Sequence, residues 1–193
     1  MSLYQFLIFI HVLGAMALFV AIGIEAVALG RLRRAETPAD ARVWLGLFRL
    51  PGRVGPIAML TALASGAWMM KVSWGYQAWI AGALAAMVGM AVIGAVVSLR
   101  RMRRLRAALH AESGLSEALR SSPALVTSLR LRIALGVGIL ALMTTKPSDH
   151  ATAILVLATA VVAALAASIP LATRPVNTGN IRNERTIEAP GRI

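Results

Sequence analysis

The chain has 193 residues, of which 58% are hydrophobic and 15% are charged, and its formal net charge is +12. The apolar residues form blocks long enough to cross a bilayer, which excludes an ordinary soluble domain. The arginines lie beside these blocks, so we expect the lipid bilayer and its anionic headgroups as partners, and no nucleic acid. Because the chain lacks cysteine, disulfides and thiolate metal sites are excluded.

Residues 3–30 predict the first membrane-spanning helix. At about 1.5 Å per residue this helix is about 42 Å long, which exceeds the roughly 30 Å hydrocarbon core of a bilayer. His11 and Glu25 are 14 positions apart and therefore return to within about 40° of one helix face. A neighbouring strip of the helix carries the small residues Gly14, Ala17 and Ala21. Small residues allow helices to approach closely, so we expect this side to face the protein interior.

A short helix in the plane of the membrane interface is predicted next. Thr37 is a suitable N-cap, Pro38 suits the first helical position, and Asp40 places an acid in the first turn. Apolar side chains then repeat along one face opposite arginines, as in an interfacial helix. Pro51 and Gly52 are expected to end this helix.

Four further hydrophobic segments complete the prediction of an all-α, polytopic membrane helix bundle with five transmembrane helices. They occupy residues 54–72, 78–99, 133–145 and 151–172. The third span runs without a helix breaker into a cytoplasmic helical extension that is expected to end near residue 111. The apolar part of the fourth span is only about 20 Å long, so Arg130 and Arg132 are expected inside the inner leaflet.

The distribution of basic residues predicts the orientation. Residues 31–53, 100–132 and 174–193 carry six, eight and four arginines, whereas the other loops carry Lys71 and Lys146. By the positive-inside rule, the amino terminus is outside and the carboxyl terminus is cytoplasmic. We interpret residues 1–173 as a single transmembrane helical domain and residues 174–193 as a disordered cytoplasmic tail.

His11 is the candidate metal ligand, because ionisable side chains within a membrane span are functional candidates and a neutral imidazole binds haem iron, copper or zinc. The alternative is a histidine that donates one hydrogen bond to a neighbouring helix. A thioether at similar depth is a possible second soft ligand. The methionines expected at that depth are Met69, Met87 and Met143.

Glu25 and Arg132 are expected at similar depths in the inner leaflet. We predict that they form a structural ion pair that docks the fourth span on the first, and the alternative is a proton or substrate pathway. His110 and His150 are expected to be solvated. The sequence shows no hydrolase triad, phosphate loop, zinc spacing or pair of carboxylates, which favours a function without catalysis and indicates no catalytic residues.

Three segments, FLIFIHVLGAMALFVAIG, SLRLRIALGVGIL and ALMTTKP, resemble a bacterial family of integral membrane proteins of unknown function, domain of unknown function 2269. The resemblance spans most of residues 3–172. That family is distantly similar to copper-resistance-D-like membrane proteins and to haem-containing protoporphyrinogen oxidases, which share a histidine in the first span. The resemblance implies the bacterial inner membrane, haem b as a cofactor, His11 as its axial ligand, and Arg130 or Arg132 near its propionates. An arginine stands near the place of a lysine in the oxidase-like relatives, and it cannot replace that lysine as an acid or base.

Three functions compete on these grounds. The first is a protein that holds b-type haem through His11 between the first and fourth spans. Residues expected to leave room for the porphyrin are Gly14, Ala21, Gly136 and Gly138. The second is a small-solute or ion-handling protein that uses His11 and Glu25 as the polar ends of a seam, a reading weakened by the bulky Leu18 between them. The third is a structural subunit that docks a membrane complex or forms a homo-oligomer.

Overall fold

The computed structural model describes residues 2–35, 37–100, 107 and 123–167, and no strand occurs in these ranges. The helices are α1 (Leu3–Leu32), α2 (Pro38–Leu47), α3 (Arg49–Met69), α4 (Ala78–Ile93), α7 (Pro123–Thr145) and α8 (His150–Ala166). Two π-helical turns, η1 (Met70–Trp74) and η2 (Gly94–Leu99), extend α3 and α4. The prediction of an all-α fold is therefore confirmed for the described residues.

Three of the described helices are long and apolar enough to cross a membrane. They are the helical segments Leu3–Leu32, Ala78–Val97 and Ala124–Thr145, and His150–Ala166 is a shorter apolar helix. Large apolar side chains on the outside of α1, such as Phe9, Val12 and Met16, are about half exposed or more. Such a surface is typical of a helix that faces lipid, so the structure agrees with a membrane-embedded protein.

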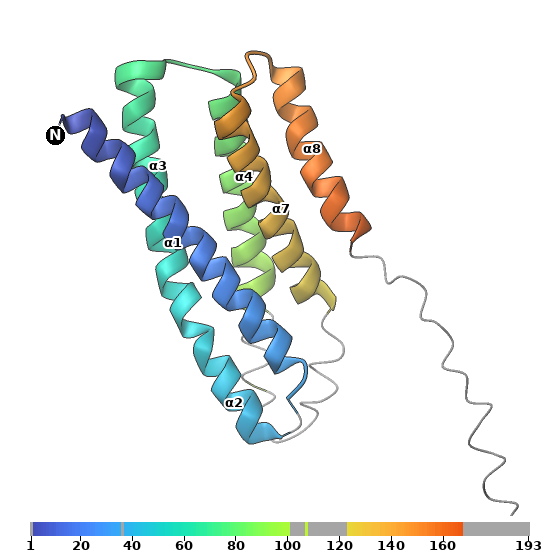
Figure 1. The fold of residues 1–193 in the computed structure, drawn as a ribbon. Coiled ribbons are helices and arrows are strands. Elements are labelled where there is room, and N and C mark those ends of the chain that lie inside the picture. The colour runs from blue at the N-terminus through green and yellow to red at the C-terminus, as the bar shows by residue number, and fades with distance from the viewer. Residues whose placement is uncertain (1, 36, 101–106, 108–122, 168–193) are drawn as a thin grey trace, which may run out of the picture.

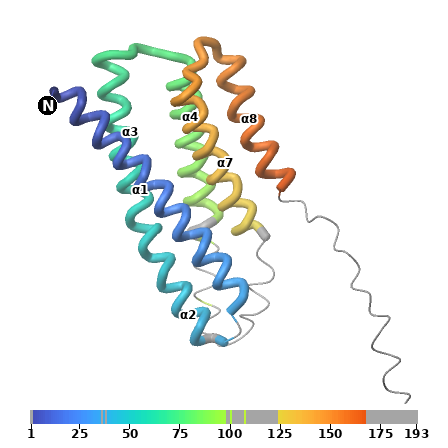
Figure 2. The backbone as a smooth tube through the Cα atoms, viewed as in Figure 1, coloured from blue at the N-terminus to red at the C-terminus, as the bar shows by residue number. Residues whose placement is uncertain are grey.

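The helices form two groups that meet along one side (Figure 1). In the first group, α1 packs along α3 and contacts α2. In the second group, α7 packs against both α4 and α8. The two groups touch mainly where α1 meets α7, and the backbone trace shows the same division (Figure 2). Two pockets are lined by residues from both groups.

Two clusters of buried apolar side chains stabilise the bundle, and the larger one joins the two groups. The larger cluster lies near α2, where Leu32, Leu45 and Phe48 pack with residues of α4 and α7. The smaller one contains Trp79 and Leu142 and lies near the opposite end of α4 and α7. His11 and Glu25 lie along one seam on α1, where each lines a space between the helices.

The boundary between the predicted interfacial helix and the predicted second span differs from the expectation. Thr37 caps α2 as expected and its Oγ1 accepts a hydrogen bond from the Asp40 amide. The helix ends at Leu47, however, and α3 already begins at Arg49, so Pro51 and Gly52 start a helix and do not end one. The reason is that Pro51 lies in the first turn of α3, where its missing N–H has no helical partner to lose.

Other boundaries differ less. The connection between the predicted spans at residues 54–72 and 78–99 is shorter than expected, because η1 carries the helix to Trp74 and Gly75 turns the chain with a φ of 63°. Pro123 is the first residue of α7, and Asp149 caps α8. The expected cytoplasmic helical extension, His110 and the tail at residues 174–193 lie outside the described residues.

Candidate functional site

The imidazole of His11 is bound to α3. Its Nδ1 lies 2.9 Å from the carbonyl oxygen of Ala62 and 3.2 Å from Oγ of Ser65. A carbonyl oxygen only accepts, so Nδ1 carries the proton and donates it. His11 therefore donates a hydrogen bond to a neighbouring helix, which is the arrangement that we considered as the alternative to a metal ligand.

The hydrogen bonds around Ser65 fix this tautomer. Ser65 is buried, and its hydroxyl donates to the carbonyl oxygen of Thr61 at 2.6 Å. The lone pairs of Oγ thus remain to accept from His11 Nδ1–H. With Nδ1 protonated in a neutral ring, Nε2 carries a lone pair and can accept a hydrogen bond or bind a metal. A backbone carbonyl that orients the other nitrogen is the usual support of a metal-binding histidine.

Two glycines make room for this arrangement. A Cβ on Gly14 would lie 3.0 Å from the Ala62 nitrogen and 3.1 Å from the Ala58 oxygen, so α1 and α3 are in close backbone contact there. A Cβ on Gly66 would lie 3.2 Å from Cε1 of His11. The small residue at position 66 therefore leaves the space in which the imidazole lies.

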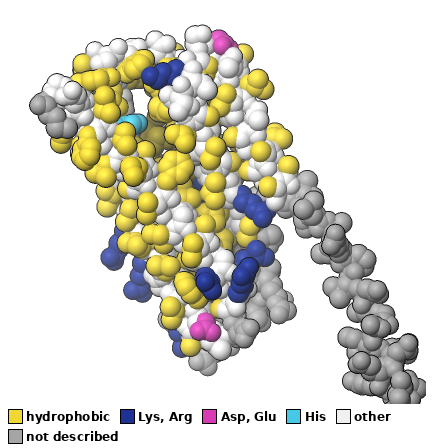
Figure 3. Space-filling view, in the orientation of Figure 1, with side chains coloured by type: hydrophobic (Ala, Val, Ile, Leu, Met, Phe, Trp, Pro, Cys, Tyr) yellow, Lys and Arg dark blue, Asp and Glu magenta, His cyan; other side chains and the backbone are white. Residues whose placement is uncertain are grey.

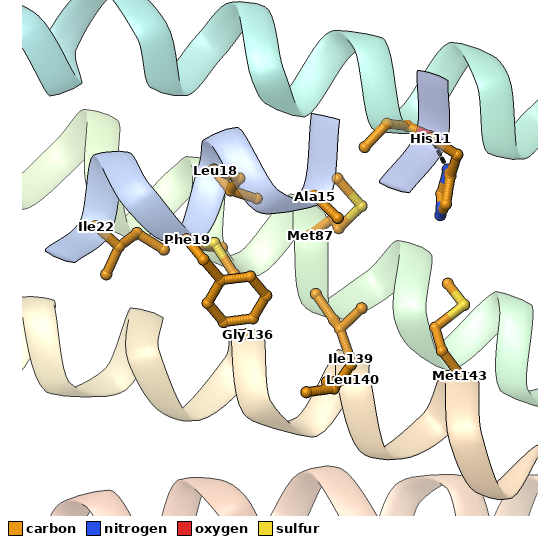
Figure 4. Close-up of a pocket in the computed structure, with 12 residues that line it drawn as sticks. His11, Ala15, Leu18, Phe19, Ile22, Met87, Gly136, Ile139, Leu140 and Met143 are labelled. Carbon is orange, nitrogen blue, oxygen red and sulfur yellow. Dashed lines mark hydrogen bonds between the residues drawn. The ribbon is translucent and has the colours of Figure 1, made fainter. Parts of the chain in front are cut away.

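His11 lines a small pocket between the two helix groups, with a volume of about 90 Å³ (Figure 4). In the close-up, the ring extends from its hydrogen bond at α3 toward the side of α4 and α7. The lining is almost entirely apolar apart from the imidazole and includes three thioethers. These methionines are Met87, Met90 and Met143. Met69, which we also expected at this depth, is not among the residues that line the pocket.

The structure brings Glu25 and Arg132 together. Nη2 of Arg132 on α7 donates to Oε1 of Glu25 on α1, and the two side chains are 11% and 13% exposed. Arg130 points elsewhere, because its Nη1 donates to the Ala167 carbonyl oxygen beyond α8 at 2.7 Å. The two arginines that sequence analysis treated together thus have different partners.

A second, larger cavity of about 710 Å³ lies around the ion pair. It shares Leu18, Ile22 and Met90 with the pocket at His11, so the two spaces are neighbours along one seam. Its lining also contains Arg49 and Arg53 from the start of α3, which sequence analysis did not single out. Arg49 and Arg53 line the cavity because α3 begins at Arg49, whereas Pro51 had been expected to end the preceding helix.

Three of the four residues expected to leave room for a porphyrin pack against neighbouring atoms, whereas the fourth, Ala21, lines the larger cavity. Gly14 packs against α3, Gly138 would bring a Cβ within 2.9 Å of Leu157 on α8, and the ring of Phe19 lies against Gly136. The pocket that contains His11 is smaller than the roughly 300 Å³ at which ligand sites usually begin. The cavity of sufficient size does not include His11. A porphyrin ligated by His11 therefore does not fit this packing.

Within the described part of the chain, no cluster of three or more histidine and acidic side chains could hold a metal ion. Any metal at His11 must therefore use other ligands, and thioethers are the side chains at hand. Comparisons with protein-family models, with curated proteins and with solved structures give no match.

Proposed function

We propose that the chain is a multi-pass membrane protein whose outer half binds one soft metal ion, Cu(I), through Nε2 of His11 and methionine thioethers. In this proposal α1, α3, α4, α7 and α8 are the five spans, and the end of the bundle near α2 is cytoplasmic. Support for α3 as a span comes from its 21 residues, about 31 Å, to which η1 adds five more. Basic side chains gather over the lower half of the face in Figure 3, on the side of α2, which favours this orientation.

The observation that carries the metal proposal is the hydrogen bond from Nδ1 of His11 to the Ala62 carbonyl oxygen. It leaves Nε2 as the free nitrogen in a pocket that also contains three thioethers. Imidazole and thioether together favour Cu(I) over Mg²⁺, Ca²⁺ or Mn²⁺, which prefer oxygen ligands. A pocket of about 90 Å³ suits a single ion.

The test is an anaerobic Cu(I) titration of the protein in mild detergent, in competition with a chromogenic Cu(I) chelator. We expect one Cu(I) per chain in the wild type and loss of this binding in His11→Ala. The matched control His150→Ala, which removes an exposed histidine, should bind as the wild type does. Ser65→Ala removes one hydrogen-bond partner of Nδ1, and we expect about a 10-fold to 100-fold loss of affinity.

Two methionine variants test the thioether ligands. Met143→Leu keeps a similar volume but removes a sulfur that lines the pocket, and it should weaken binding. Met69 does not line the pocket, so Met69→Leu should not weaken binding. If His11→Ala binds Cu(I) as tightly as the wild type, the proposal is wrong.

The same purified protein distinguishes the other functions. A Soret band that disappears in His11→Ala would favour b-type haem and would require a packing different from the one described. Absence of both copper and haem binding would favour the reading of His11 as a packing residue in a structural subunit, or as one polar end of a solute seam with Glu25.

A further inference from the structure

The cavity around Glu25 and Arg132 has a different chemistry from the pocket at His11. Its wall carries three guanidinium groups, from Arg49, Arg53 and Arg132, and one carboxylate, from Glu25. The carboxylate already pairs with Arg132. Among the described residues, no acidic partner is recorded for Arg49 or Arg53, and both are exposed. The cavity wall therefore has a surplus of positive charge.

The donors of Arg132 are only partly used. A guanidinium has five N–H donors, and the recorded acceptor among the described residues is Glu25. Its Nε is buried and has no hydrogen-bond partner there. An oxygen-rich anion beside this arginine would supply the missing acceptors.

The rest of the cavity wall is apolar. Its apolar lining includes Met59, Ala91 and the three residues that it shares with the pocket at His11, which are Leu18, Ile22 and Met90. A void of about 710 Å³ with apolar walls and basic residues at one end matches a molecule with an anionic head and a hydrocarbon chain. Basic pockets between membrane helices on the cytoplasmic side are recognised sites for anionic lipid headgroups.

We propose that this cavity binds one anionic phospholipid of the inner leaflet, with its phosphate against Arg49, Arg53 and Arg132 and an acyl chain along α1 and α4. The guanidinium groups recognise the phosphate of the headgroup through its negative charge and through their forked arrangement of N–H donors. Glu25 limits the positive charge and keeps Arg132 oriented toward the cavity. This proposal rests on the orientation proposed above, and His11 is not among the residues that line the lipid site.

The apolar part of the cavity can be filled without disturbing the fold. Gly55 lines the cavity, and a Cβ at this position would meet nothing within 4 Å. Gly55→Leu therefore adds volume to the void, and leucine favours a helix more than glycine does. Gly23→Leu is its matched control, because position 23 on α1 is exposed, open to a Cβ and outside the cavity lining.

The basic part is tested by charge removal. Arg49→Gln with Arg53→Gln removes two positive charges from the cavity wall and leaves the ion pair intact. Arg33→Gln with Arg34→Gln removes the same charge from exposed positions near the end of α1 that do not line the cavity.

The experiment compares these four variants with the wild type by native mass spectrometry and by thermal unfolding followed through tryptophan fluorescence. The protein is placed in nanodiscs or detergent with phosphatidylglycerol, with phosphatidylcholine, or with soluble glycerol phosphate. We expect the wild type and both controls to retain one phosphatidylglycerol and to gain several degrees in unfolding midpoint from it. Gly55→Leu and the Arg49/Arg53 variant should lose at least about tenfold in lipid affinity, while Gly55→Leu keeps its unfolding midpoint in plain detergent.

Each other outcome overturns the proposal. Equal retention of phosphatidylcholine would show that charge does not select the ligand. Stabilisation by glycerol phosphate alone, to the same extent as by the lipid, would identify a soluble anion as the ligand. Loss of lipid in the Arg33/Arg34 control to the same extent as in the Arg49/Arg53 variant would place binding on the general basic surface and not in the cavity.

Discussion

Glu25 on α1 accepts a hydrogen bond from Nη2 of Arg132 on α7, and the two residues are 107 positions apart in the chain. Both side chains are nearly buried. The pair joins the group of α1, α2 and α3 to the group of α4, α7 and α8, which otherwise meet over a small area. The pair also lines the larger cavity, which shares Leu18, Ile22 and Met90 with the pocket at His11.

Breaking this pair should destabilise the bundle. Glu25→Gln leaves the Arg132 guanidinium without its carboxylate in a poorly solvated place, and such a loss costs about 3 to 5 kcal/mol. We expect a lower thermal midpoint and lower yield of folded protein, measured by tryptophan fluorescence and size-exclusion chromatography. The double reversal Glu25→Arg with Arg132→Glu should recover part of the loss. A Glu25→Gln variant as stable as the wild type would remove the basis of the pairing.

Gly14 should tolerate no side chain, because the atoms nearest to its Cβ position belong to the backbone of α3. Gly14→Ala forces α1 and α3 apart, and overpacking of this kind costs about 1 to 3 kcal/mol. The shift should also displace Ala62, the partner of His11, so Cu(I) affinity should fall. Gly23→Ala is the control, since nothing lies within 4 Å of its Cβ position. Identical melting curves for the two variants would contradict the close contact.

The orientation is testable because the chain has no cysteine of its own. Ser73 and Ser148 are exposed and lie at the end of the bundle opposite α2. Single cysteines introduced at these positions should react with an impermeant maleimide in intact cells. A cysteine at Ser113 should react only after the cells are opened. Labelling of position 113 in intact cells, with no labelling at position 73, would invert the proposed topology.

Sequence patterns predicted the helical class because hydrophobic blocks and caps are local signals. The cap at Thr37, for example, follows directly from the residues around it. The interfacial helix boundary was predicted wrongly because a proline reads as a stop unless one knows that it lies in the first turn of the next helix. Because of this boundary, Arg49 and Arg53 were expected outside the second span, whereas they lie at the start of α3 and line the larger cavity.

The candidate site was only partly predictable for a similar reason. Helical spacing and depth placed Glu25 near Arg132, because both quantities can be counted along the chain. Which neighbouring helix a glycine contacts cannot be derived from its position in the sequence, because it depends on how the helices pack. Gly14 and Gly138 were expected to line a porphyrin cleft, yet they serve the contacts of α1 with α3 and of α7 with α8.

The turn between α7 and α8 is held to the turn after α3 by an aromatic contact that sequence analysis did not anticipate. Nζ of Lys146 lies 4.3 Å from the ring centre of Trp74, and Trp74 donates from Nε1 to the Tyr4 hydroxyl at 3.3 Å. Lys146 has a φ of 46°, so asparagine is the suitable replacement, because it tolerates that backbone conformation. Lys146→Asn should lose about 0.5 to 1 kcal/mol of stability in thermal unfolding. The same change made in a Trp74→Leu background should cost less, and an equal cost would rule out the cation–π contact.

The stability of α8 should depend on the ionised carboxylate of Asp149. Oδ1 of Asp149 accepts from the Thr152 amide at 2.7 Å, and this hydrogen bond holds the pKa of the carboxyl below its ordinary value of 3.8. A lowered pKa in the folded state means that the carboxylate stabilises the folded state at pH values above 3.8, and that this contribution is lost as the pH falls through the lowered pKa. We therefore expect the unfolding midpoint of the wild type to fall as the pH is lowered below the ordinary carboxyl pKa of 3.8. Asp149→Asn keeps a capping oxygen but has no charge to lose, so its midpoint should fall less over the same range. Parallel falls in the two proteins would show that Asp149 does not contribute to the acid sensitivity.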